Sequence, residues 1–155
     1  MISPEAANAF LSQPRITVVG ASDDRSNFGG TVYRALRDHG VDVVPVHPTA
    51  ATVAGDLCHP DLASVPDLGA VLVMVNPAQA IDVVRTCLDR GVDRIWLFKG
   101  LGGPGAVSSE AVQLCEERGV DVIAGACPLM FLEPVGLPHR VHRVFRRLNG
   151  SLAAA

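Results

Sequence analysis

The tripeptide Gly-Val-Asp occurs three times, beginning at Gly40, Gly91 and Gly119, and this repetition is the feature that most constrains the fold. Each copy follows a stretch with apolar residues at helical spacing and leads into a run of β-branched residues. A glycine just past a helix can take the left-handed conformation that ends it, and a strand can begin soon afterwards. The repeats therefore predict alternating helices and strands.

Five short apolar runs are expected to be strands, near residues 16–20, 42–46, 70–75, 94–98 and 121–124. The third run is apolar at every position, which is typical of a strand in a parallel sheet that is covered on both faces. Helices are expected between most strands, with right-handed crossovers. We therefore predict an α/β protein with a Rossmann-like, doubly wound parallel sheet of about five strands, in three layers.

The length of 155 residues suits a single domain over residues 1–155. We place its core at residues 12–130 and a C-terminal helix at residues 139–148. The segment between the second and third strands, residues 49–69, holds several turn-forming residues and no long helical stripe. This crossover is therefore predicted to be mostly loop.

Composition and charge exclude several classes of partner. The net charge of −3 predicts no general affinity for nucleic acid. The longest apolar run, residues 70–75, is far shorter than the roughly 20 residues of a membrane span, so no membrane partner is expected. The N-terminus has no signal-peptide pattern, which predicts a cytoplasmic protein. A homo-oligomer or a partner protein stays open, because four arginines on the predicted C-terminal helix can be solvated or contact a neighbouring subunit.

The four cysteines are predicted to be free thiols, since no CxxC pair occurs among Cys58, Cys87, Cys115 and Cys127. Cys127, His139 and His142 are the best candidates for a zinc site, but they lack a fourth ligand, so no metal is predicted. Cys127 follows the fifth strand, where a thiol could be reactive near a ligand. Unpaired cysteines are more often inert core residues.

Residues 15–48 contain a complete strand, loop, helix and second strand, the half-fold that binds nucleotides. Its turn, Gly20-Ala21-Ser22, has only small side chains where a ligand can approach the backbone. Ser26 or Asn27 can cap the next helix, whose free N–H groups and positive dipole end favour an anion. A phosphate or diphosphate is therefore predicted at this turn.

The dinucleotide fingerprint GxGxxG is absent, because the glycines fall at positions 20, 29 and 30. The second strand ends in Val46-His47-Pro48, where NAD-binding folds place an acidic residue that holds the ribose. Both observations count against NAD and favour another phosphate-bearing adenosine ligand.

Ligands of doubly wound sheets bind beyond the carboxyl ends of the strands. The predicted strand ends read Gly20-Ala21-Ser22, His47-Pro48, Asn76-Pro77, Lys99-Gly100 and Gly125-Ala126-Cys127. Lys99 precedes the glycine-rich segment 100–105, which is either a loop that closes over a ligand or a mobile surface loop. Both alternatives stay open at this point.

The motifs VVGAS, a loop with Ser and Arg, VVPVHP, a glycine at position 55, VNP after the third strand and WLFKG after the fourth occur in this order. Together they resemble the CoA-binding domain family over roughly residues 12–130. These are small cytosolic Rossmann-like proteins, similar to the N-terminal domain of the succinyl-CoA synthetase α subunit. His47 departs from the family's usual PVNP motif, and the synthetase's phosphohistidine loop has no counterpart, so ligase chemistry is not implied.

The resemblance implies coenzyme A or an acyl-CoA as the ligand. It places Gly20, Ala21 and Ser22 around the CoA phosphates, with Arg25 and Asn27 nearby, and it places His47, Pro48, Asn76 and Pro77 along the nucleotide or pantetheine. Lys99 and Gly100 complete the set of candidate binding residues. The guanidinium of Arg25 suits a phosphate because it offers two parallel N–H donors.

The sequence contains no nucleophile with a positioned base and no paired carboxylates at a strand end, so no catalytic residues are predicted. We therefore expect a CoA-binding module that senses or carries CoA more than an enzyme. The alternatives are an oxidoreductase with an NAD-type cofactor, a CoA-ligase or transferase subunit completed by a partner chain, and an interaction protein with a degenerate pocket.

Overall fold

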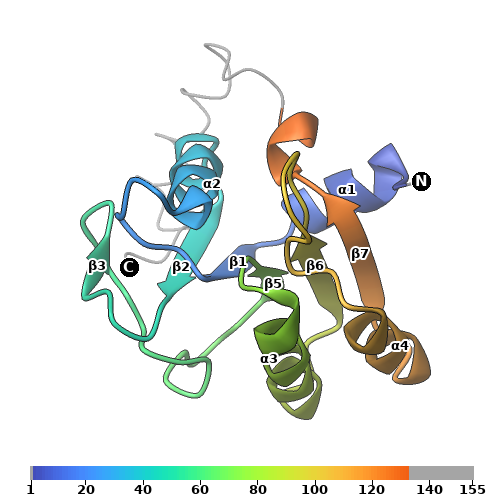
Figure 1. Ribbon diagram of the computed structural model, residues 1–155. Coiled ribbons are helices and arrows are strands. Elements are labelled where there is room, and N and C mark those ends of the chain that lie inside the picture. Colours follow the sequence, from blue (N-terminus) through green and yellow to red (C-terminus); the bar gives the residue numbers. More distant parts are fainter. Residues whose placement is uncertain (1, 133–155) are drawn as a thin grey trace.

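The computed structural model describes residues 2–132, which form a central sheet between two layers of helices (Figure 1). Its elements are α1 (Pro4–Leu11), β1 (Arg15–Val19), α2 (Phe28–Asp38), β2 (Asp42–Val46), β3 (Thr52–Val53), β4 (Asp56–Leu57), β5 (Ala70–Val73), α3 (Pro77–Asp89), β6 (Arg94–Phe98), α4 (Ser109–Glu117), β7 (Asp121–Ala126) and the 3-10 turn η1 (Pro128–Phe131). The predicted C-terminal helix at 139–148, with His139 and His142, lies outside the described residues. None of the described helices is long and apolar enough to cross a membrane.

The five main strands are all parallel and lie in the order β2-β1-β5-β6-β7. Val19 at the end of β1 is paired with Val46 on one side and Val73 on the other. The chain moves outward from β1 to β2 and then crosses back to β5, so the strand order reverses between β1 and β5. This confirms the predicted Rossmann-like α/β fold and puts the switch point, where such sheets bind ligands, beside Val19.

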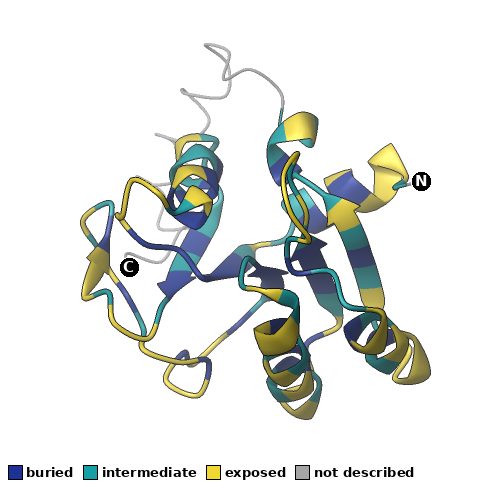
Figure 2. Cartoon of the chain, viewed as in Figure 1, coloured by how far each residue is buried: buried dark blue, intermediate teal, exposed yellow. Residues whose placement is uncertain are grey.

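Helices cover both faces of the sheet, α1 and α2 on one and α3 and α4 on the other (Figure 1). Alternate strand residues serve the two faces: Leu72 and Trp96 pack with α1 and α2, whereas Val71 and Ile95 pack with α3 and α4. Figure 2 shows the resulting buried strands between helices with exposed outer sides. Burial on both faces explains why the strands are nearly continuous apolar runs.

No helix was predicted before residue 15, but α1 forms there. Its buried residues Ala7 and Phe10 pack on the sheet, and the Phe10 ring meets Trp96 edge-on at 5.2 Å between centroids. The indole N–H of Trp96 donates to the carbonyl oxygen of Ala126 at 3.0 Å. This buried aromatic residue therefore joins α1, β6 and the end of β7.

The predicted cap of α2 is confirmed in the structure. Of the two candidates before α2, Asn27 is the cap, and its Oδ1 accepts from the Gly30 N–H at 3.2 Å. Asn76 caps α3 and Ser108 caps α4 in the same way. The three Gly-Val-Asp glycines all have positive φ, at 87°, 73° and 67°, as the helix-ending pattern predicts.

The crossover from β2 to β5 contains no helix, as predicted, but it includes a short antiparallel hairpin of β3 and β4 that was not predicted. Side chains of α2 hold this hairpin in place. The Tyr33 hydroxyl donates to Asp56 at 2.7 Å, and Arg37 bonds both Asp56 and the Ala54 carbonyl oxygen. The Ala54 N–H also donates to the Asp23 carboxylate at 3.0 Å. The hairpin is thus fixed beside the loop that follows β1.

Candidate functional site

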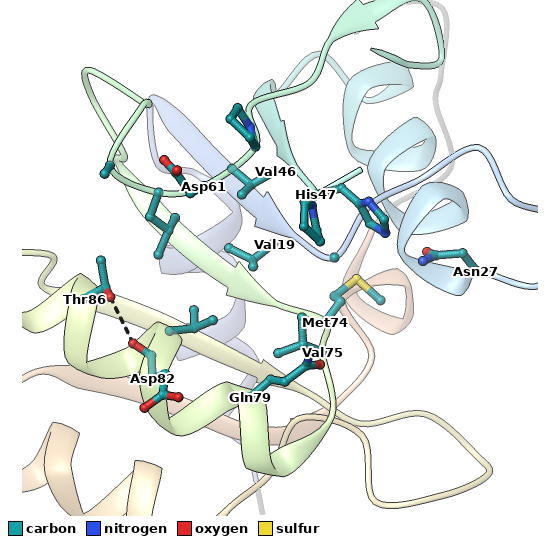
Figure 3. Close-up of a pocket in the computed structure, with 16 residues that line it drawn as sticks. Val19, Asn27, Val46, His47, Asp61, Met74, Val75, Gln79, Asp82 and Thr86 are labelled. Atoms are coloured by element: carbon teal, nitrogen blue, oxygen red, sulfur yellow. Dashed lines mark hydrogen bonds between the residues drawn. The ribbon is translucent and has the colours of Figure 1, made fainter. Parts of the chain in front are cut away.

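The carboxyl ends of β1, β2 and β5 surround a hollow of about 600 Å³, which we call the switch-point hollow (Figure 3). This volume lies within the range of about 300–1,000 Å³ that small-molecule sites occupy. The hollow is lined by Val19, Gly20, Asn27, Val46, His47, Pro48, Pro60, Asp61, Leu62, Ala63, Met74, Val75, Gln79, Asp82, Val83 and Thr86. It therefore lies where the topology predicts a ligand.

Gly20 lies at the edge of this hollow, at a position where no side chain fits. A Cβ there would lie 2.5 Å from the Met74 carbonyl oxygen, and the φ of Gly20 is 98°. A Cβ on Gly29, in the first turn of α2, would lie 2.4 Å from the Gly20 carbonyl oxygen. The small residues thus bring the beginning of α2 against the end of β1. Unpaired N–H groups at a helix beginning attract anions.

His47 borders the hollow at the end of β2. Its side chain accepts hydrogen bonds from the backbone of the following turn, as asparagine side chains often do. Its Nδ1 accepts hydrogen bonds from the backbone N–H groups of Thr49 and Ala50, each at 3.2 Å. Since Nδ1 is an acceptor, the neutral imidazole carries its proton on Nε2. His47 therefore orders the turn after β2 and keeps one N–H donor for a ligand.

A second hollow of about 490 Å³, the loop hollow, lies beside the first. Asn27 and His47 line both hollows, so the two adjoin at these side chains. The other lining residues come from the loops after β1 and β2 and from the start of β3: Ser22, Asp23, Asp24, Ser26, Thr49, Ala50 and Thr52. The two hollows together offer a continuous path around the beginning of α2, with apolar walls at the strand ends and polar groups in the loops.

The acidic residues of the loop hollow are occupied by neighbouring groups. Asp24 Oδ1 accepts from the Ser26 hydroxyl at 2.6 Å and the Ser26 N–H at 2.8 Å, and these bonds lower the pKa of Asp24. Asp23 forms an ion pair with Arg34. Arg25, which follows Asp24 in this loop, is exposed and has no hydrogen bond or ion pair within residues 2–132. Its guanidinium is therefore available to an anionic ligand.

One wall of the switch-point hollow comes from residues that the sequence analysis did not select. Gln79, Asp82, Val83 and Thr86 share one face of α3 (Figure 3), and residues 60–63 come from the loop before β5. Their helical spacing of three and four behind the Asn76 cap is a signal for a shared face. No local pattern shows that this face borders the strand ends.

The structure brings together only part of the predicted site. Gly20, Asn27, His47 and Pro48 line the switch-point hollow, and Ser22 lines the loop hollow. Other predicted residues line neither: Ala21 is buried in the core, Asn76 caps α3 and bonds the Gln79 side chain, Pro77 is in the first turn of α3, and Arg25 is on the exposed loop.

Lys99 and Gly100 lie at a separate hollow of about 800 Å³ at the ends of β6 and β7, which we call the apolar hollow. Its lining consists of Ile2, Phe28, Phe98, Lys99, Gly100, Leu101, Gly102, Gly125, Ala126, Cys127, Met130 and Phe131. Phe28 follows Asn27 directly in the chain, so the two regions meet at the beginning of α2.

The four cysteines are free thiols, as predicted. Burial raises the pKa of Cys87 to about 12 and that of Cys115 to about 11, so both thiols are protonated at neutral pH. Cys127 is less buried and lines the apolar hollow. Within residues 2–132, no three His, Cys, Asp or Glu side chains are arranged to hold a metal ion.

Comparisons with known proteins agree with this architecture. The Bacillus subtilis (strain 168) protein YneT is 30% identical over 114 residues, which cover 73% of this chain and 81% of YneT. A solved structure, a hypothetical protein from Pyrococcus horikoshii OT3, is 26% identical with a TM-score of 0.75, and the match covers 84% of this chain and 89% of that one.

A longer relative contains a similar segment. The ADP-forming acetate–CoA ligase I of Archaeoglobus fulgidus is 27% identical over 118 residues, covering 72% of this chain but only 17% of the ligase. The family described as the CoA binding domain matches residues 14–133. This range includes every strand of the sheet and the lining of the switch-point hollow and the loop hollow. The chain belongs to the CoA-binding domain family.

Proposed function

We propose that this protein binds coenzyme A, or an acyl-CoA, with the nucleotide in the switch-point hollow and the loop hollow. The observation that carries this proposal is the continuity of the two hollows at Asn27 and His47, at the switch point of a CoA-binding-family fold. The proposed role is that of a binding module, and no reaction is assigned to it.

The phosphates are assigned to the beginning of α2. The close approach of Gly20 and Gly29 leaves no side chain between the β1 turn and the first turn of the helix. Arg25 adds a guanidinium with no competing partner among the described residues, and its two parallel donors suit a phosphate. The nearby Asp24 carboxylate repels a phosphate less strongly because it accepts two hydrogen bonds from Ser26.

The adenosine is assigned to the switch-point hollow, because its walls combine apolar and polar groups. Val19, Val46 and Val75 offer flat apolar contact from the three strand ends. The Nε2–H of His47 and the Nε2 group of the exposed Gln79, whose Oε1 already accepts from Asn76, offer hydrogen bonds at the edge. A purine, which has an apolar face and polar edges, matches this lining.

Isothermal titration calorimetry with CoA, dephospho-CoA, NAD and FAD tests the proposal. We expect saturable binding of CoA, weaker binding of dephospho-CoA, and no comparable response to NAD or FAD. Ala63→Trp should fill the switch-point hollow from its exposed loop and weaken CoA binding at least tenfold, about 1.4 kcal/mol.

Ala9→Trp is the matched control, because Ala9 is an exposed alanine of α1 beside β7, at the other end of the sheet (Figure 1). It should bind CoA like the wild type. Saturable binding of NAD without a response to CoA would overturn the proposal. Equal binding of CoA by Ala63→Trp and the wild type would remove the nucleotide from this hollow.

A further inference from the structure

The apolar hollow contains fewer polar groups than the switch-point hollow and the loop hollow, although it lies at the same edge of the sheet. It sits where β6 and β7 end, between the loop after β6 and η1 (Figure 1). Its lining includes Phe28, Phe98, Leu101, Met130 and Phe131, and Lys99 is the one charged side chain that the described part of the chain contributes to it. Within residues 2–132, no carboxylate lines this hollow. It is therefore suited to an apolar group with a polar end.

Large apolar side chains are unusually exposed around this hollow. The described chain has four exposed large hydrophobic residues, and three of them line it: Phe28 is 46% exposed, Leu101 107% and Met130 77%. The rings of Phe28 and Phe98 contact one another, with centroids 5.6 Å apart. Clustered exposed apolar side chains mark binding sites more often than scattered ones do. The cluster therefore indicates a ligand or partner that covers it.

The location of the hollow favours one occupant. Asn27 lines both the switch-point hollow and the loop hollow, and the next residue, Phe28, lines the apolar hollow. A ligand that leaves its nucleotide at Asn27 and continues past Phe28 thus moves from polar to apolar surroundings. An acyl-CoA has this order of groups, with phosphates at one end and a hydrocarbon chain at the other.

We propose that the apolar hollow binds the acyl chain of a medium-chain acyl-CoA thioester, an inference that rests on the proposed CoA binding. The chain would lie against Phe28, Leu101 and Met130. Lys99 has no hydrogen bond or ion pair from its side chain within residues 2–132, so its ammonium group is available to the thioester carbonyl oxygen. The glycine-rich loop after Lys99 then forms one wall of the acyl site.

A calorimetric series of CoA, acetyl-CoA, butanoyl-CoA, hexanoyl-CoA and octanoyl-CoA tests this inference. Each methylene buried in the hollow should tighten binding by up to about fourfold. Leu101→Glu and Met130→Glu each put a charge in the hollow at an exposed position, so folding should be little affected. Both should remove most of the gain that octanoyl-CoA has over acetyl-CoA.

Leu57→Glu is the matched control, because Leu57 is 75% exposed on β4 and lies outside the hollow. It should keep the full dependence on chain length. A second readout is alkylation of Cys127 by iodoacetamide, since Cys127 lines the hollow and the other three thiols are buried. Octanoyl-CoA should slow this labelling at least fivefold, and acetyl-CoA should slow it much less.

The outcomes separate the two proposals. Absence of CoA binding would overturn the proposed function itself. Binding of CoA with the same affinity for every acyl chain would overturn the acyl site alone. If a second copy of this chain or its residues 133–155 cover the hollow instead, octanoyl-CoA will give no gain and no protection of Cys127, which also overturns the inference.

Discussion

The two ends of the ligand-binding edge are built in opposite ways. At β1, β2 and β5, the surface is formed by backbone held in fixed turns, by hydrogen-bonded side chains such as His47 and by the first turn of α2. At β6 and β7, it is formed by exposed aromatic and aliphatic side chains with the single charge of Lys99. We call the first the polar region, because its backbone and side-chain hydrogen-bonding groups are held in place, and the second the apolar region.

This difference indicates how the two regions contribute to binding. In the proposed function, fixed donors at the polar region would bind phosphates and a purine with strict geometry, so small displacements there would weaken binding sharply. The apolar region would gain binding through apolar area removed from water, which depends less on geometry and more on the length of the acyl chain. Substitutions should therefore have sharp effects in the first region and graded effects in the second.

The largest expected difference concerns two glycines with similar backbone angles, Gly20 in the polar region and Gly125 in the apolar region. Their φ values are 98° and 101°. An added Cβ meets backbone at Gly20 and nothing within 4 Å at Gly125. Gly20→Ala should cost about 3–5 kcal/mol of unfolding free energy and Gly125→Ala about 1–2 kcal/mol. Equal losses in denaturant unfolding would remove this contrast between the regions.

Alkaline pH should destabilise the packing beneath the polar region. Cys87 of α3 is fully buried, and burial raises its pKa from 9.0 to about 12. Because the folded-state pKa of Cys87 is raised, its contribution to the free energy of unfolding is complete below about pH 9. The free energy of unfolding should then fall by about 2–4 kcal/mol as the pH rises from about 9 to about 12.

Chemical unfolding at a series of pH values measures this effect. Cys87→Ala should lose less stability than the wild type over the same pH range, because the buried thiol is gone. Val84→Ala, at a neighbouring buried position of α3 without a titratable group, should keep the wild-type pH dependence. Identical pH profiles for the wild type and Cys87→Ala would contradict the assignment.

A smaller effect is expected at His47, whose side chain orders the turn after β2 and is proposed to contact the ligand. His47→Ala leaves the Thr49 and Ala50 N–H groups without their acceptor and should cost about 1–2 kcal/mol of stability. His47→Asn should restore most of this stability, because an asparagine Oδ1 can accept the same bonds. Thermal unfolding measures both variants. An asparagine variant no more stable than the alanine variant would argue against this role of Nδ1.

The smallest effect concerns the exposed charge of the polar region. Arg25→Gln should weaken CoA binding about three- to tenfold and make it less sensitive to salt, since an exposed charge contributes about 1 kcal/mol. Arg118→Gln is the control, because Arg118 is exposed at the end of α4, away from all three hollows. Calorimetry at low and high salt measures both. Equal affinities for the two variants would leave Arg25 as a solvated loop residue.

Much of the fold could be predicted because local signals and tertiary packing agree. The cap at Asn27, the glycines that end the helices and the apolar strands are read directly from the sequence. The β3–β4 hairpin was missed because each strand has two residues, and its turn places Ala54 at a φ of 51°, where glycine or asparagine is the usual signal.

The candidate site was predictable where it follows from strand ends. Gly20 and His47 come directly after β1 and β2, so topology places them together. Asp61 and Thr86 reach the same hollow from a loop and a helix face, and only the packed structure brings them there. Asn76 shows the limit of the strand-end rule, since its side chain caps α3 instead of lining a hollow.

The most direct test of the central claim is to follow backbone amide shifts of the labelled protein by NMR during titration with CoA. CoA binding at the polar region should shift the amides of residues 20–29, 47, 49–50 and 61–63 in a saturable way, with smaller changes at residues 125–127 and 129–131. Saturable shifts confined to the β6–β7 end, or none at the β1 and β2 turns, would contradict the account.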